Sequence, residues 1–239
     1  MSTQRIASLV PFATEIVCAL GLRESLVAVS HVCDYPPSVK ELPAVTAQTP
    51  ILAPHRETDA DGDSMEVPLS AGEIDAAVRS GAPLYTIDTA TLRELAPTII
   101  FTQGLCDVCA VSHVATLEAA RELEGTAQIV DLSPTNIAGV LDAIRIVGAA
   151  TGRDAEASEL VSDMIARFES VKLSAMESPN HPRVLLLEWP EPLFCAGHWS
   201  PELLDVAHAV AAPWDKPGAP SRIIMWNDVL RFDPEVIVL

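Results

Sequence analysis

The 239-residue sequence has few basic residues: 15 lysines and arginines stand against 33 acidic residues, which gives a net charge of -18. Binding to a phosphate backbone through counterion release requires basic side chains. A chain with this negative net charge is poorly suited to it, so we expect no nucleic-acid partner. Long apolar runs are also missing. Although the mean hydropathy is +0.27, no segment has the eighteen or so consecutive apolar residues of a membrane-spanning helix.

Cysteines are few and odd in number: Cys18, Cys33, Cys106, Cys109 and Cys195. An odd count at low density does not make a disulfide scaffold and fits a reducing compartment. The N-terminal residues run directly into a strand-like segment, without the basic and apolar regions of an export signal. The sequence therefore predicts a cytoplasmic protein, or a periplasmic or cell-surface one if the start site is assigned too far downstream.

The composition and the hydrophobic periodicity predict an α/β fold. Hydrophobic residues make up 49% of the chain and charged residues 20%, which is typical of a folded core. Short apolar segments typical of strands occur at 5–10, 26–30, 84–88, 98–102 and 127–132. Most are separated by helical periodicity, and this alternation predicts parallel strands joined by crossovers in a lobe over residues 1–133.

A second lobe is expected after a helical connection over residues 134–178. The connection contains a predicted helix over 154–177, which would be about 36 Å long at 1.5 Å per residue. Residues 179–239 return to an α/β pattern and end in a strand-like segment. Because a parallel strand without a covering helix leaves one sheet face bare, we expect this C-terminal lobe to be incomplete.

Polar and aromatic residues follow the predicted strands, where ligands bind in open parallel sheets. The candidate ligand-binding residues are His31, Tyr35, Gln103, Cys106, Cys109, Trp189, His198 and Trp199. The tryptophans suit the apolar walls of a large flat ligand, although both could instead pack in the core of the second lobe. The histidines could coordinate a metal within that ligand, hydrogen-bond its edge, or simply cap their own loops.

Four segments resemble the cobalamin-binding branch of ABC-transporter substrate-binding proteins: Arg5 to Leu22, Leu26 to Pro37, Ala96 to Gln103 and Trp189 to Leu203. Two further patterns, at residues 30–36 and 102–112, resemble a sub-branch that often lacks an export signal. An acidic insertion around residues 55–66 departs from that pattern, and so does the segment Ala207-His208-Ala209, where a glycine pair is usual.

The resemblance implies two Rossmann-like lobes with parallel sheets, joined by one long rigid helix, as in the helical-backbone class of substrate-binding proteins. It also implies a ligand held in a cleft between the lobes, with cobalamin as the expected cargo and haem as an alternative. A monomer is expected, with an ABC permease as its partner and no enzymatic activity.

Cys106 and Cys109 carry the spacing of a metal-binding hairpin. Together with Cys33 and His31 they could complete a tetrahedral site for zinc or iron. The same four residues support a second hypothesis, a cytosolic metal-binding or thiol-dependent enzyme on the same scaffold. Against it, a second Cys-x-x-Cys pair is absent from the sequence and no familiar catalytic motif occurs.

Overall fold

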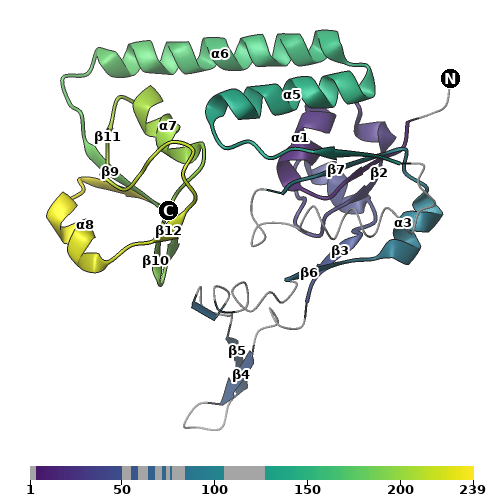
Figure 1. Cartoon of the computed structure of the whole chain (residues 1–239), viewed down its shortest axis with the longest axis horizontal. Coiled ribbons are helices and arrows are strands. Elements are labelled where there is room, and N and C mark those ends of the chain that lie inside the picture. The colour runs from purple at the N-terminus through teal and green to yellow at the C-terminus, as the bar shows by residue number, and fades with distance from the viewer. Residues whose placement is uncertain are drawn as a thin grey trace. The chain divides into compact units, whose positions relative to one another are not determined.

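The computed structural model describes residues 4–49, 55–58, 64–67, 72–73, 76, 84–104 and 127–239 (Figure 1). The chain divides into two compact units. Unit 1 consists of Met1–Ser133 and Val147–Arg153, and unit 2 consists of Pro134–Ile146 and Asp154–Leu239. Among the described residues, no helix has both the length and the apolar character needed to cross a membrane.

Unit 1 is built on a parallel sheet with the strand order β2-β1-β7-β8. Its strands are β1 (Ile6–Ser8), β2 (Leu26–Val29), β7 (Ile99–Thr102) and β8 (Gln128–Asp131). Every residue of β1 and β7 is buried, as expected for the central strands of a parallel sheet that is covered on both faces. Small and branched side chains from β1, β2 and β7 form the core with Val45 and Leu92.

Local sequence signals place the helices of unit 1. Helix α1 (Pro11–Ala19) begins with a proline, which is favoured there because the first turn needs no backbone donor. It stops before Gly21, whose φ of +74° is the left-handed conformation that ends many helices. Helix α3 (Thr89–Leu95) is capped by the Asp88 carboxylate, which accepts from the Thr91 N–H at 3.0 Å. Two short 3₁₀ turns, η1 (Arg23–Ser25) and η2 (Pro37–Glu41), flank β2.

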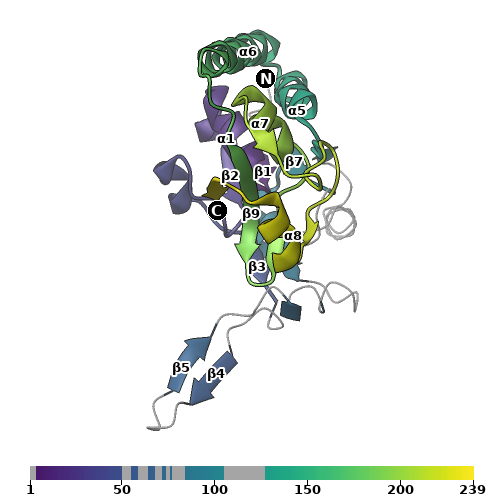
Figure 2. The same cartoon turned by 90° about the vertical axis from the view of Figure 1, so that its left-hand side faces the viewer.

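Two antiparallel pairs lie outside the parallel sheet: β3 (Thr46–Gln48) with β6 (Tyr85–Ile87) (Figure 1), and β4 (His55–Thr58) with β5 (Ser64–Val67) (Figure 2). The predicted strand at 84–88 is therefore present but does not join the main sheet. Next to β2, the Val29 N–H donates to the Pro43 carbonyl and the Val29 carbonyl accepts from the Val45 N–H. That edge of β2 is thus occupied by the chain just before β3, and β6 pairs with β3 instead.

Unit 2 is organised around the long strand β9 (Arg183–Pro190). Strands β11 (Val210–Ala211) and β13 (Val236–Val238) pair with β9 in parallel. Strand β10 (Leu193–Cys195) returns antiparallel to β9, and β12 (Arg222–Ile223) is antiparallel to β10. The α/β class predicted from the sequence is confirmed, with β10 and β12 as antiparallel additions to the expected parallel strands.

Helix α5 (Ile137–Thr151) is divided between the two units, whereas α6 (Asp154–Met176), α7 (Ser200–Val206) and α8 (Trp226–Phe232) belong to unit 2. Helix α6 has 23 residues, which makes it about 35 Å long, and α7 packs against it (Figure 1). The long helix predicted over 154–177 is therefore present. Its buried residues are Ala157 and Val161, whereas Val171, Leu173 and Met176 near its end are exposed.

His208 adopts the left-handed conformation that glycine favours, with a φ of 52°. It follows α7, and its N–H bonds to the Asp205 carbonyl at 3.1 Å. Its ring meets that of His181 edge to face, with centroids 4.2 Å apart, but Nδ1 is buried without a hydrogen-bond partner among the described residues. The backbone at His208, in the segment where the family resemblance leads us to expect a glycine pair, therefore has a conformation that glycine favours.

Replacing His208 with glycine is expected to raise the free energy of unfolding by about 1 kcal/mol, because the left-handed conformation costs any residue with a Cβ roughly that much. Thermal unfolding measures the change. His208→Ala is the matched control, since it removes the ring but keeps the Cβ. A lower melting temperature for H208G than for wild type would show that the ring contact with His181 outweighs the backbone strain.

Candidate functional site

The chain that follows β2 is held in place by a buried hydroxyl pair, Ser30 and Thr46. The Thr46 hydroxyl accepts from the His31 backbone N–H at 3.0 Å and lies 2.7 Å from His31 Nδ1. It donates its own hydrogen to the Ser30 hydroxyl at 3.1 Å. Because a threonine hydroxyl has one hydrogen to give, we infer that His31 carries its proton on Nδ1 and donates it to Thr46.

This arrangement leaves His31 Nε2 with a lone pair. The atom is buried and has no hydrogen-bond partner among the described residues. Burial lowers the pKa of His31, so the imidazole is neutral near neutral pH. A neutral imidazole nitrogen of this kind can accept a hydrogen bond or ligate a metal.

Cys33 ties the same loop to α1. Its Sγ lies 3.2 Å from the Thr14 hydroxyl, which donates to the Ser8 hydroxyl at 2.8 Å. Ser8 in turn donates to the Val10 carbonyl at 3.1 Å. With both hydroxyl hydrogens used, the Cys33 thiol is the donor to Thr14. Burial raises the pKa of this thiol, so Cys33 is a neutral group that anchors the loop.

The predicted metal set of His31, Cys33, Cys106 and Cys109 stays a prediction, because residues 105–126 lie outside the described residues. Within the described part of the chain, no group of three or more histidine, cysteine, aspartate or glutamate side chains is placed to hold a metal ion.

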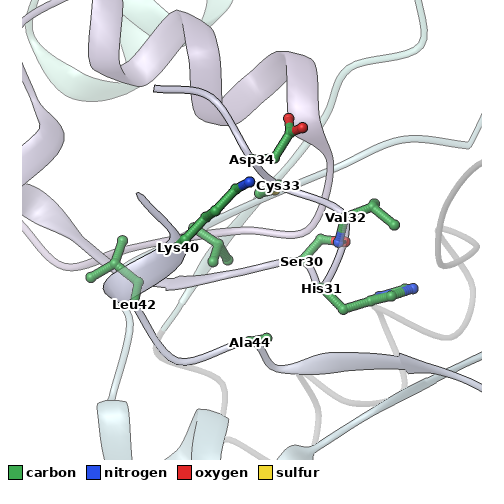
Figure 3. Close-up of a pocket in the computed structure, with 9 residues that line it drawn as sticks. Ser30, His31, Val32, Cys33, Asp34, Lys40, Leu42 and Ala44 are labelled. Carbon is green, nitrogen blue, oxygen red and sulfur yellow. The ribbon is translucent and has the colours of Figure 1, made fainter. Parts of the chain in front are cut away.

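A pocket of about 410 Å³ opens beside the loop after β2 (Figure 3). It is lined by Val29, Ser30, His31, Val32, Cys33, Asp34, Lys40, Leu42 and Ala44. Figure 3 shows Lys40 and Asp34 on one side of the loop, with His31 and Val32 on the other. Next to this pocket the Tyr35 side chain is 62% exposed, which leaves its ring available to a ligand.

Gln103 lies directly after β7 and is buried. The neighbouring Gly104 N–H donates to the Ser133 hydroxyl at 2.8 Å, and that hydroxyl donates to the Asp131 carboxylate at 2.9 Å. These bonds hold together the chain segments that leave β7 and β8. Gln103 is thus placed at a strand end of the main sheet, as predicted, while Cys106 and Cys109 lie outside the described residues.

In unit 2, Trp189 lies near the end of β9 and pairs with Phe194 across the β9–β10 hairpin. Its side chain is 39% exposed, and it is not among the residues of the hydrophobic cluster of unit 2. The preceding residue, Glu188, accepts a hydrogen bond from the Ser221 hydroxyl at 2.7 Å. This bond links the end of β9 to the chain just before β12.

The segment Gly197-His198-Trp199 requires glycine at its first position. A Cβ on Gly197 would collide with the backbone of residues 219–221. Two backbone hydrogen bonds hold the same two segments together. The His198 N–H donates to the Ala219 carbonyl at 2.7 Å, and the Gly218 N–H donates to the His198 carbonyl at 2.9 Å. His198 and Trp199 are half-buried, with ring centroids 6.2 Å apart.

The structure thus groups His31 and Tyr35 on one loop of unit 1, and Trp189, His198 and Trp199 on the β9–α7 segment of unit 2. Sequence reasoning missed the residues that support these loops, notably Thr14, Thr46 and Ser221. A single serine or threonine does not change the hydrophobic pattern of a short strand or turn. Its hydrogen bonds to distant segments therefore cannot be predicted from the sequence around it.

The periplasmic binding protein family matches residues 6–239 of the chain. A vitamin B12-binding protein of Vibrio campbellii is 31% identical over 125 residues, which cover 51% of this chain and 45% of that protein. One of Vibrio parahaemolyticus is 34% identical over 100 residues, or 40% of this chain and 36% of that protein. The matched stretches span less than half the length of these curated relatives.

Solved structures of similar fold include the periplasmic vitamin B12 binding protein BtuF of Vibrio cholerae. It has a TM-score of 0.65 and 22% identity, and the match covers 98% of this chain and 75% of BtuF. The periplasmic haem-binding protein RhuT from Roseiflexus sp. RS-1 has a TM-score of 0.67 and 20% identity, with 99% of this chain and 76% of RhuT covered. At these identities the likeness establishes the fold.

Replacing Thr46 with valine is expected to lower the free energy of unfolding by about 2 kcal/mol, because two His31 donors then lose their buried acceptor. Urea denaturation measures the loss. Thr86→Val is the matched control, since the exposed Thr86 hydroxyl makes only a 3.4 Å contact with the Ala47 carbonyl. Equal stability of T46V and T86V would contradict the role assigned to Thr46.

Proposed function

Because the chain belongs to the periplasmic binding protein family, we propose that it is the substrate-binding component of an ABC transporter and binds cobalamin or a related metal chelate. The family and its structural neighbours are substrate-binding proteins and not enzymes. The alternative of a cytosolic metal-binding or thiol-dependent enzyme therefore loses its support.

The observation that carries this proposal is the exposure of large aromatic rings on the candidate loops. Tyr35 and Trp189 are exposed on the loop after β2 and near the end of β9. Flat rings that are held in water by a rigid backbone offer stacking surfaces to a large flat ligand, which needs apolar walls and few polar anchors. A corrin or a porphyrin has that shape.

Polar anchoring is assigned to His31, Gln103 and His198, with Cys106 and Cys109 as further lining residues from the sequence. His31 is the best supported of these, because its Nε2 is a neutral acceptor without a partner among the described residues. The proposal that residues of both units contact one ligand is tested by variants in each unit, such as Tyr35→Ala and Trp199→Ala.

The vitamin B12- and haem-binding relatives of similar fold are named as periplasmic proteins, which supports a periplasmic location for this chain. The cytoplasmic location expected from its first residues has no support among them. A membrane permease is the proposed partner, and a monomeric state is proposed for the binding protein itself. Light scattering of the purified protein tests that state.

Replacing Trp189 or Trp199 with alanine is expected to weaken cobalamin binding by roughly tenfold or more, because stacking anchors account for a large share of binding energy. Isothermal titration with cyanocobalamin, and in parallel with haem, measures the affinities. Trp226→Ala is the matched control, since Trp226 is an exposed tryptophan on α8 outside the candidate site. The proposal fails if wild-type protein binds neither compound, and the stacking role fails if W189A and W199A bind as tightly as W226A.

A further inference from the structure

Asp215 is a buried acid that the candidate ligand loops do not use. The residue is 7% exposed, and neither carboxylate oxygen has a hydrogen-bond partner among the described residues. It lies in the turn after β11, where its N–H bonds to the Ala212 carbonyl at 2.9 Å. An ionised carboxylate in such a place is unfavourable, because it has lost its water without gaining hydrogen bonds.

The charge of Arg222 on β12 acts on the Asp215 carboxylate, and the charges of Asp215 and of Glu188 on β9 both act on the Cys195 thiol of β10. Burial raises the pKa of the Cys195 thiol, so Cys195 stays neutral. Burial also raises the pKa of Asp215 to about 6, and the Ala212 backbone and the attraction of the exposed Arg222 only partly oppose this rise. The Asp215 carboxyl is therefore neutral in mild acid and charged above it.

The segment that carries Asp215 also supports the Gly197-His198-Trp199 loop. Within six residues after Asp215 come the backbone groups of Gly218 and Ala219, which bond to His198, and the backbone of Ser221, which lies against Gly197. On the other side of Asp215, the Trp214 ring packs against the core of unit 2 and meets Phe232 edge to face at 5.8 Å. Asp215 is thus joined to the His198–Trp199 loop by one short segment, residues 215–221.

We propose that Asp215 is a proton switch that holds the His198–Trp199 loop in its binding position when protonated and loosens it when ionised. The ionised carboxylate needs water, which an opening of the segment 212–221 away from Gly197 would supply. The part of this inference that concerns ligand affinity rests on the proposed function, because it requires that this loop binds the ligand.

The direction of the pH effect follows from the raised pKa. The carboxyl of Asp215 has an ordinary pKa of 3.8 and titrates at about 6 in the folded chain. The stabilisation that the protonated Asp215 carboxyl gives the loop is complete below pH 3.8 and is lost as the pH rises through about 6. Ligand affinity is therefore higher in mild acid and falls toward alkaline pH.

The first test needs no ligand: the indole N–H signals of the tryptophans are followed by NMR as a function of pH. The signals of Trp199 and Trp214 shift with a midpoint near pH 6 in wild type, and they stay constant over that range in Asp215→Asn. Asp205→Asn, which removes an exposed acid of α7, behaves as wild type. Because D215N retains His198, a titration that survives in D215N belongs to another group and overturns the proposal, as does a wild type without titration.

The second test measures cyanocobalamin affinity at about pH 5 and about pH 8, and wild type is expected to bind about tenfold more weakly at the higher pH. In D215N the affinity is the same at both pH values, and D205N retains the wild-type dependence. Equal pH dependence in wild type and D215N overturns the switch. If wild type binds neither cobalamin nor haem at any pH, the proposed function fails while the indole titration still decides the switch. Asp215→Ser provides a second non-ionisable variant if D215N does not fold.

Discussion

The buried hydroxyl groups at the carboxyl ends of β1 and β2 can each donate one hydrogen, and this limit determines how the first candidate loop is presented. Thr46 gives its hydrogen to Ser30, and Thr14 gives its hydrogen to Ser8. His31 and Cys33 must then act as donors to these threonines. As a result, His31 has a neutral imidazole whose Nε2 lone pair lacks a partner among the described residues, and Cys33 has a neutral thiol. Hydrogen bonds to Thr46 and Thr14 fix these two side chains. Tyr35 extends from this rigid base into water.

Unit 2 fixes its candidate loop by close backbone packing instead. Gly197 lies so near the backbone of residues 219–221 that no Cβ fits, and two backbone hydrogen bonds hold His198 to the same segment. The position of this loop therefore depends on the position of the segment 218–221, which supports it. Asp215 lies in that segment, where burial and the absence of a hydrogen-bond partner in the described chain make its charged form unfavourable.

The fold class and the long helix were predictable because they rest on repeated patterns. Alternating strands and helices predicted the α/β fold, and continuous periodicity predicted the helix that the structure shows as Asp154–Met176. The antiparallel strands β10 and β12 were missed, because segments of two or three residues are too short to show a period. Tyr35 and Trp189 were identifiable by their position after predicted strands, but Thr46 and Asp215 act through contacts between distant segments, and no local pattern records those.

The central claim is that exposed aromatic rings on strand-end loops receive a large flat metal chelate. Native mass spectrometry of the protein mixed with cyanocobalamin, and separately with haem, tests this claim most directly. The account predicts a species with the mass of one protein chain plus one molecule of at least one of these compounds, and loss of that species when Tyr35 and Trp189 are both replaced by alanine. Unliganded protein alone in both mixtures would contradict it.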